Sequence, residues 1–457
     1  MHKKTKIHFI GIAGIGMSSL AEFLCKNYTI TGSDLSNNEI STKLKKKGIK
    51  VYEHQLAENI TNQNLVIYTS AIKKNNPELV EAKKRGIKCI TRGKALGEFT
   101  RNDKNICITG THGKSTTTNY LAQILLNCGK KPSVFLGAIN TKLKTNFIYN
   151  RSSLNVIEAD ESDNSFNFLN SMYSVITNID FDHMDFYKTK KNLYFAFENF
   201  IKKTTNKVIV NIDCPNIKKI ITKNPNKKIV RFSNIDKNIE FYFEIINRKK
   251  STEIILYKKK NILGLFKFQR ISQYNCYNVV SSIVTAIEMG ISTERIKKIS
   301  KKLNQPGRRF EKIYERKNIS IIDDYAHHHN AIKEVRKFIK DDEDTRTILV
   351  FQPHRFTRLR KNYKNFLNEI SLWKEVIVSD IYSAFEKKQK FTSREFVDEL
   401  KKINKTCNAY YINDYNKIVT KLKKEISKNN SNIRIITMGA GDIRKVATRL
   451  VNTIKNG

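Results

Sequence analysis

A glycine-rich turn between an apolar stretch and a helical stretch constrains the fold of this chain more than any other feature. In ICITGTHGKSTTT, residues 106–118, the first three residues are typical of a buried strand, and the apolar spacing from Thr116 onward predicts a helix. A turn of the form Gly-x-x-Gly-Lys-Ser in this setting is typical of a loop that binds phosphate. Its backbone N–H groups would surround phosphate oxygens at the positive end of the helix. The alternative is an ordinary glycine turn with a solvated lysine.

We call residues 110–115 the phosphate loop. Lys114 would reach the β- and γ-phosphates of a nucleotide, and the Ser115 hydroxyl would ligate Mg²⁺. The expected nucleotide contacts of this segment are Gly110, Thr111, His112, Gly113, Lys114, Ser115 and Thr116.

Composition excludes several classes of function. The chain has 457 residues, enough for about three domains, and its seven cysteines lack a C-x-x-C pair, which argues against a zinc site. Lys and Arg total 84 against 43 Asp and Glu, but the lysines are spread along the whole chain. The net charge of +41 therefore indicates attraction of anionic substrates and no nucleic-acid-binding element. No apolar run approaches the ~18 residues of a membrane span, and we expect a cytoplasmic protein without membrane partners.

Residues 1–103 have the pattern of a nucleotide-binding α/β domain. An apolar strand at 6–10 is followed by glycines in G-x-x-G-x-G spacing, a helix through Leu24 and a second strand that ends at Asp34. In a dinucleotide-binding domain, an acidic residue at this place contacts a ribose. The glycine spacing differs from the usual G-x-G-x-x-G, so the pattern alone is compatible with several nucleotides, NAD included. Continued alternation of helix and strand predicts a parallel sheet.

Residues 104–310 would form a second α/β domain around the phosphate loop. Two acidic clusters each follow an apolar strand. Because the carboxyl ends of parallel strands meet at one edge of a sheet, both clusters should converge on the loop and form a Mg²⁺–ATP site. The alternative is a pair of solvated acidic loops. The clusters are Glu158, Asp160, Glu161 and Asp163, and then Asp180, Asp182, His183 and Asp185.

Residues 311–457 predict a third parallel α/β domain, with strands that end near Asp323 and Gln352. The three histidines at 327–329 could suggest a metal site, but consecutive residues cannot all face one ion, which favours hydrogen bonding. Arg355 and Arg358 would share one face of a helix start and suit a carboxylate or phosphate. The alternative for these arginines is a surface ion pair.

Taken together, the motifs resemble the Mur ligases, the ATP-dependent amide-forming enzymes of peptidoglycan precursor synthesis. The resemblance covers essentially the whole chain and rests on GIAGIGMS, GSD, TSAI with NPE, ITGTHGKSTTT, EADESD, TNIDFDHMD, GRRF, DDYAHH, FQPHRFTR and GAGDI, in this order. It implies three α/β domains: Rossmann-like, phosphate-loop ATPase-like and again Rossmann-like. Within the family, the set is most similar to members that add L-alanine to UDP-N-acetylmuramate through an acyl-phosphate, acting as monomers or homodimers with ATP and Mg²⁺ or Mn²⁺.

The resemblance also implies roles for particular residues. The implied catalytic residues are Lys114, Glu158, His183, His327, Arg355 and Arg358, and Ser115, Glu158 and His183 would hold the metal. Further nucleotide contacts would come from Asn275, Asn278, Arg309 and Asp323. The UDP-sugar would be bound by Gly11, Gly14, Gly16, Met17, Ser18, Asp34, Ser70 and Arg92.

Four positions depart from the family pattern. Ser272 and Tyr274 stand where the family has Gly and His before the long helix, His329 stands at a usual Pro and Phe385 at a usual Gly. Two related activities remain as alternatives: a recycling ligase that attaches a whole tripeptide to UDP-N-acetylmuramate, and a relative without catalytic activity. FQPHRFTR argues against the first, and intact Lys114 and Ser115 argue against the second.

Overall fold

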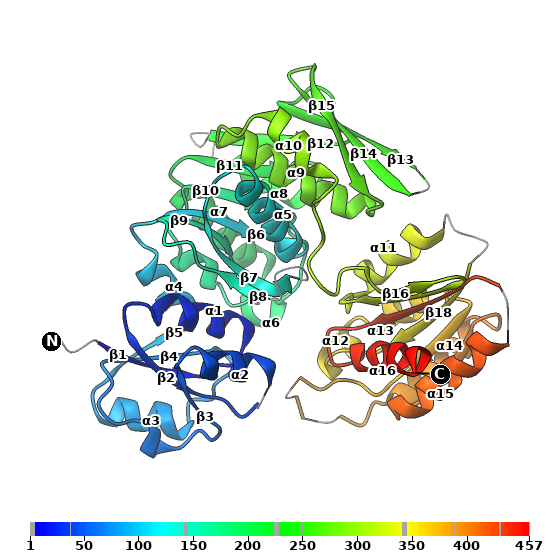
Figure 1. The fold of residues 1–457 in the computed structure, drawn as a ribbon, viewed down its shortest axis with the longest axis horizontal. Helices are drawn as coiled ribbons and strands as arrows, with labels where there is room; N and C mark the ends of the chain where they lie inside the picture. The colour runs from blue at the N-terminus through cyan, green and yellow to red at the C-terminus, as the bar shows by residue number, and fades with distance from the viewer. Residues whose placement is uncertain are drawn as a thin grey trace. The chain divides into compact units, whose positions relative to one another are not determined.

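The computed structural model describes residues 5–36, 38–140, 145–223, 228–248, 250–340, 345–384, 386–387, 389–428 and 431–456. The chain divides into two compact units, Met1–Pro306 and Gly307–Gly457, which we describe separately (Figure 1). No helix among the described residues is both long enough and apolar enough to cross a bilayer.

The N-terminal sheet is parallel throughout, in the order β3-β2-β1-β4-β5. The apolar run of β1 is buried between its neighbours, with Phe9 in register with Gly32 and Ile67. Its strands are β1 (Lys6–Ile10), β2 (Thr29–Ser33), β3 (Lys50–Tyr52), β4 (Leu65–Tyr68) and β5 (Lys88–Thr91), and its helices are α1 (Ile15–Leu24), α2 (Glu39–Lys46), α3 (Pro77–Lys84) and α4 (Arg92–Phe99).

In the segment IKCITRG, residues 87–93, strand β5 ends at Thr91, because Arg92 and Gly93 already belong to α4. Gly93 allows this helix to approach the segment around Ser165 closely, since a Cβ at Gly93 would lie 2.4 Å from the Ser165 Cβ.

The central sheet has ten strands in the order β15-β14-β13-β12-β11-β10-β6-β9-β7-β8. The strands from β13 to β7 pair in parallel, and β14, β15 and β8 extend the two ends in antiparallel pairing. The strands are β6 (Lys104–Thr109), β7 (Ser133–Asn140), β8 (Thr145–Ile148), β9 (Leu154–Glu158), β10 (Tyr173–Ile176), β11 (Lys207–Asn211), β12 (Lys228–Ser233), β13 (Phe241–Asn247), β14 (Ser251–Lys258) and β15 (Asn261–Gln269).

Strand β6 lies inside this sheet and is buried on both faces. Ile106 and Ile108 pack with α5 (Lys114–Asn127) and α9 (Gln273–Glu288), whereas Cys107 packs on the opposite face. That face is covered by α7 (Lys190–Lys203) and α8 (Pro215–Ile221). The buried strand and following helix predicted around the phosphate loop are confirmed. The unit also contains the short α6 (Met184–Tyr187) and α10 (Thr293–Ser300).

The sheet of the second unit has the order β16-β17-β21-β18-β19-β20 and is parallel except for β16. The edge strands β16 and β20 were not predicted. The elements are β16 (Glu311–Arg316), β17 (Ile319–Asp324), β18 (Arg346–Phe351), β19 (Glu375–Val378), β20 (Asn408–Tyr411) and β21 (Ile433–Met438), with α11 (His329–Lys340), α12 (Phe356–Lys361), α13 (Tyr363–Ile370), α14 (Ser393–Ile403), α15 (Tyr415–Ser427) and α16 (Arg444–Lys455). The expected fold class, three α/β domains with mostly parallel sheets, is confirmed.

Candidate functional site

The phosphate loop joins the end of β6 to the start of α5, and its two glycines are required by both conformation and space. Gly110 and Gly113 have φ angles of +129° and +83°. A Cβ at Gly113 would lie 2.3 Å from Asn278 Oδ1, and one at Gly110 would lie 2.3 Å from Thr177 Oγ1. Only glycine fits both positions without displacing neighbours.

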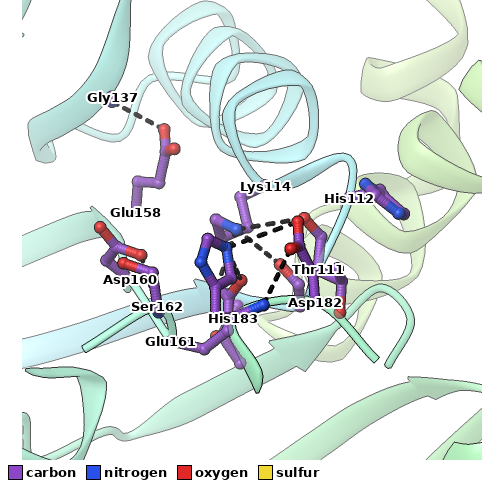
Figure 2. Close-up of polar contacts among 12 residues, drawn as sticks. Thr111, His112, Lys114, Gly137, Glu158, Asp160, Glu161, Ser162, Asp182 and His183 are labelled. Carbon is purple, nitrogen blue, oxygen red and sulfur yellow. Dashed lines mark hydrogen bonds and ion pairs between the residues drawn. The ribbon is translucent and has the colours of Figure 1, made fainter. Parts of the chain in front are cut away.

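Lys114 is buried at the start of α5 and held in place by the loop. Its Nζ donates hydrogen bonds to the carbonyl oxygens of Gly110 (2.7 Å) and Thr111 (3.3 Å) and lies 2.7 Å from Glu161 Oε2 (Figure 2). Burial alone would lower the pKa of Lys114, but the carboxylates of Glu161 and Asp160 outweigh it and raise this pKa above its usual value. The lysine is therefore a permanent cation at the site.

Two glutamates border the loop: Glu158 is the last residue of β9, and Glu161 follows three residues later. Ser115 Oγ donates to Glu158 Oε1 (2.8 Å). The Gly137 N–H donates to Glu158 Oε2 (2.7 Å), as Figure 2 shows. Glu161 is 2% exposed, and its Oε1 accepts no hydrogen bond. Burial raises the pKa of both carboxyl groups, although Ser115 lowers that of Glu158 and Lys114 lowers that of Glu161.

The second acidic cluster reaches the loop from the end of β10. The Asp180 N–H donates to Thr111 Oγ1 (2.8 Å), and the Asp180 carboxylate lies 3.6 Å from His112 Nε2. His183 Nε2 lies 4.0 Å from Glu161 Oε1 and 3.7 Å from Asp182 Oδ2. The structure thus brings both acidic clusters together at the phosphate loop.

The donor atoms at the loop fit Mg²⁺ that shares its coordination with phosphate. Within the described ranges, no group of three or more His, Cys, Asp and Glu side chains is arranged to hold a metal ion alone. Mg²⁺ usually takes one or two carboxylates, with the remaining positions filled by water and substrate phosphates. The Ser115 hydroxyl, the Glu158 carboxylate and the unpartnered, buried Glu161 Oε1 supply such oxygen donors, and His183 lies on the Glu161 side of the group.

A cavity of about 340 Å³ connects the N-terminal glycine loop with the strand-end carboxylates of the central sheet. Arg92 lies against this glycine loop, because a Cβ at Gly16 would be 3.0 Å from Arg92 Nη1, and its Nη2 is 3.9 Å from Asp160 Oδ2. Of the expected UDP-sugar contacts, five line the cavity: Gly14, Gly16, Met17, Ser70 and Arg92.

The other three expected contacts shape the glycine loop. Gly11 turns the chain with φ +85°, and Ser18 is fully buried and donates to the Ile15 carbonyl oxygen. Asp34 Oδ2 accepts a hydrogen bond from the Ala13 N–H (2.9 Å), and its Oδ1 accepts one from Ser36. In this structure Asp34 therefore fixes the loop.

The asparagines at the start of α9 lie beside the phosphate loop. Asn278 is buried, its Oδ1 accepts from Thr117 Oγ1 (3.3 Å), and its Nδ2 donates to Asn275 Oδ1 (3.1 Å). Asn275 Nδ2 donates to Gln305 Oε1 (2.7 Å). Both asparagines are thus oriented next to the loop by hydrogen bonds.

In the C-terminal unit, His327 and the two arginines gather around His354 at the end of β18. Arg358 Nη1 donates to His354 Nδ1 (3.0 Å), and Arg355 Nε donates to Glu386 Oε1 (2.8 Å). Burial, with Arg358 nearby, lowers the pKa of His327 well below its usual range and that of His354 to about 4. Both imidazoles are therefore neutral at pH 7, and His354 accepts at Nδ1 because a guanidinium can only donate.

Asp323 is held by three groups within the C-terminal unit. Its side chain has no exposed surface and is bonded to Arg308 Nε (3.0 Å), Arg444 Nη1 (3.3 Å) and the Thr437 hydroxyl (2.7 Å). Its contact with a nucleotide stays a prediction. Arg309 stacks its guanidinium against the Tyr325 ring, 5.3 Å from the centroid.

Sequence reasoning assigned no individual role to several residues that build the site. Glu161 was predicted only as part of an acidic cluster, and no sequence pattern indicated that it pairs with Lys114. Thr177 and Asn178, directly after β10, hold the backbone of the phosphate loop. Their place at the end of a parallel strand was the one signal that could have found them. His329 begins α11, and Phe385 lies outside the described residues.

Models of protein families match the chain in three consecutive segments. These are "Mur ligase family, catalytic domain" over residues 6–104, "Mur ligase middle domain" over 108–286 and "Mur ligase, glutamate ligase domain" over 308–441.

Similar proteins extend over the full length. A UDP-N-acetylmuramate–L-alanine ligase of Fusobacterium nucleatum is 35% identical, covering 98% of this chain and 97% of the relative. One of Brachyspira hyodysenteriae is 36% identical, covering 100% and 99%. The crystal structure of UDP-N-acetylmuramate–alanine ligase from Thermotoga maritima matches with a TM-score of 0.84 at 26% identity, covering 99% of each chain. The motifs, the fold and these matches agree, and the chain belongs to the Mur ligase family.

Proposed function

We propose that this chain is an ATP-dependent ligase that joins L-alanine to the carboxylate of UDP-N-acetylmuramate, in peptidoglycan precursor synthesis. The observation that carries the proposal is the position of Glu158. This residue lines the cavity that begins at the N-terminal glycine loop, and it also accepts the hydrogen bond of Ser115 in the phosphate loop. A sugar nucleotide anchored at the glycine loop would therefore extend its carboxylate toward the γ-phosphate of ATP. The full-length relatives carry this activity in their names.

The reaction has two steps, and both build negative charge. The substrate carboxylate attacks the γ-phosphorus, which gives an acyl-phosphate and ADP; the amine of L-alanine then attacks the acyl carbon, and phosphate leaves. Lys114 and the loop N–H groups would stabilise the charge on the transferred phosphoryl group. Ser115, Glu158 and His183 would hold Mg²⁺, or Mn²⁺ in its place. When bound, this ion would neutralise charge on the phosphate oxygens.

The C-terminal unit would supply the groups that orient the acceptor. Arg355 and Arg358 would bind carboxylate oxygens, for which a guanidinium has matching donors. His327, held neutral by burial, donates its Nδ1–H to the Tyr325 carbonyl oxygen (2.9 Å), so its Nε2 would be free to accept a hydrogen bond from the substrate without adding charge. Arg309 and Asp323 would contact the nucleotide, and Asp323 also fixes Arg308.

The test is phosphate release with Mg²⁺–ATP and UDP-N-acetylmuramate, comparing L-alanine, the tripeptide and no acceptor. We expect release only when the sugar nucleotide and L-alanine are both present. Release that requires the tripeptide would identify the recycling ligase instead. A protein that binds ATP but releases no phosphate under any condition would be an inactive relative.

Lys114→Ala should lower turnover by at least about a hundredfold, because it removes the cation at the transferred phosphoryl group. Binding of UDP-N-acetylmuramate, measured by calorimetry, should stay within about twofold of the unchanged protein, since Lys114 does not line the cavity. Lys130→Ala, an exposed lysine after the same helix, is the matched control and should leave turnover unchanged. Near-normal phosphate release by Lys114→Ala would contradict the assignment of the phosphate loop.

A further inference from the structure

Tyr274 lies at the start of α9, where it is hydrogen-bonded to a residue that holds the phosphate loop. The Asn178 Nδ2 group donates a hydrogen bond to the Tyr274 hydroxyl (2.9 Å), and Tyr274 is partly buried. This bond gives the tyrosine a route to the loop through the amide of Asn178.

Asn178 holds both polar backbone groups of His112. Its Oδ1 accepts from the His112 N–H (3.0 Å), and its Nδ2 donates to the His112 carbonyl oxygen (2.8 Å). A flipped amide would place oxygen against oxygen and N–H against N–H, so these two contacts fix which atom is which. Nδ2 also contacts the Tyr274 hydroxyl (2.9 Å) and, at the longer distance of 3.3 Å, Thr177 Oγ1. The Tyr274 bond is the shorter of these two, and it helps to fix the amide plane.

His112 directly precedes Gly113 and Lys114, whose backbone N–H groups begin the phosphate-binding end of α5. Gly113 has a φ of +83°, and a Cβ there would lie 2.3 Å from Asn278 Oδ1, so the loop packs closely against Asn278 at this point. The orientation of the His112 peptide therefore decides whether the following N–H groups point into the loop. A nucleotide binds most tightly when these donors are already aligned.

From these contacts we propose that Tyr274 is a positioning residue for ATP: it orients Asn178, and Asn178 holds the phosphate loop in its binding conformation. The role belongs to the hydroxyl group and not to the aromatic ring. This proposal rests on the proposed ligase function and adds a residue to its ATP site. It predicts a change in ATP affinity, with no change in the affinity for the sugar nucleotide or in the rate of the chemical step.

The test uses Tyr274→Phe, which removes only the hydroxyl. The affinity for ATP, measured by calorimetry, should fall about three- to tenfold, which is the loss of one hydrogen bond to a positioning group. The KM for ATP should rise by a similar factor. The value of kcat, the affinity for UDP-N-acetylmuramate and the thermal midpoint should stay unchanged. Calorimetry does not depend on turnover, so this result can be obtained even if the proposed ligase reaction fails.

Tyr277→Phe is the matched control. Tyr277 lies one turn further along the same helix and also donates its hydroxyl hydrogen to a polar partner, Asp213 (2.9 Å), but that partner does not contact the loop. Its loss should leave ATP affinity unchanged. Asn178→Ala should weaken ATP binding at least as much as Tyr274→Phe, and the double variant should be no worse than Asn178→Ala alone.

Three results would overturn the proposal. The first is an unchanged ATP affinity in Tyr274→Phe. The second is an equal loss in Tyr277→Phe, which would indicate a general effect of helix α9. The third is additive losses in the double variant, which would show that Tyr274 acts independently of Asn178.

Discussion

At the scale of single residues, charged side chains of the site form ion pairs with one another in the structure. Arg355 pairs with Glu386, and Lys114 pairs with Glu161. These pairs are alike in one respect: in each, a carboxylate of the protein lies where a carboxylate or phosphate of a substrate is expected. Substrate binding would therefore exchange one anionic partner for another at a fixed cation.

Arg355→Ala should raise the KM of at least one of the two non-nucleotide substrates by about tenfold or more, because hydrogen bonds to charged groups are worth more than neutral ones. ATP affinity should be unaffected. Arg360→Ala, an exposed arginine on the same helix α12, should leave both KM values unchanged. Loss of ATP binding alone in Arg355→Ala would refute the proposed role.

The sequence identified the charged residues of the site, but it could not predict which of them form pairs. Glu161 and His183 stand in separate motifs, and the 4.0 Å between their side chains results from β9 and β10, the two parallel strands that flank β6. Likewise, the pattern of GRRF and DDYAHH gave no reason to choose Arg308 over Arg309 as the partner of Asp323. The left-handed backbone of Arg308, with φ +59°, decides this choice.

At the scale of elements, the phosphate loop and helix α5 depend on two glycines with the same backbone conformation and different surroundings. Gly113 and Gly129, at the two ends of α5, have φ angles of +83° and +82°. A Cβ at Gly113 would meet Asn278 Oδ1 at 2.3 Å, whereas a Cβ at Gly129 has no neighbour within 4 Å. Any difference between alanine variants at these positions therefore reports the space around the loop.

Gly113→Ala should weaken ATP binding by at least about tenfold, because the new methyl group must displace the loop or Asn278. Gly129→Ala should cost roughly 1–2 kcal/mol of stability from backbone strain alone and leave ATP affinity unchanged. Calorimetry with ATP and thermal unfolding of both variants separate the two effects. Equal ATP affinities in the two variants would show that the close contact with Asn278 is unimportant.

Helices and strands with a clear hydrophobic pattern were predictable from the sequence. Strands that form only because a neighbouring strand pairs with them were not. The strands β6, β17 and β18 are apolar runs buried on both faces, so the sequence alone identifies them. The segments IEFYFEII and TEIILY alternate because one face is solvent-exposed, but nothing local shows that they extend the sheet in antiparallel pairing. The edge strands EKIYER and NAYY are short and polar, and they become strands only against β17 and β19.

At the scale of the whole molecule, the net charge of +41 should act on substrates before they reach the site. ATP and UDP-N-acetylmuramate are polyanions, and a positive field raises their rate of encounter. Raising the salt from about 50 mM to about 500 mM should therefore lower kcat/KM for both by about threefold or more. The KM for L-alanine, a zwitterion without net charge, is the internal control and should change much less. Equal salt dependence for all three substrates would indicate an effect on the enzyme itself.

The segment that joins the two units is anchored by hydrogen bonds on both sides. On one side, the Asn304 carbonyl oxygen accepts hydrogen bonds from Asn119 and Gln123, and Gln305 is bonded to Asn275. On the other, the Arg308 guanidinium is bonded to Asp323 and to the Gly439 and Gly441 carbonyl oxygens. Only Pro306 and Gly307 stand between these anchors, and the proline ring fixes one of their torsions. Between the two anchored ends the chain therefore keeps few free backbone torsions, unlike a flexible glycine- and serine-rich linker.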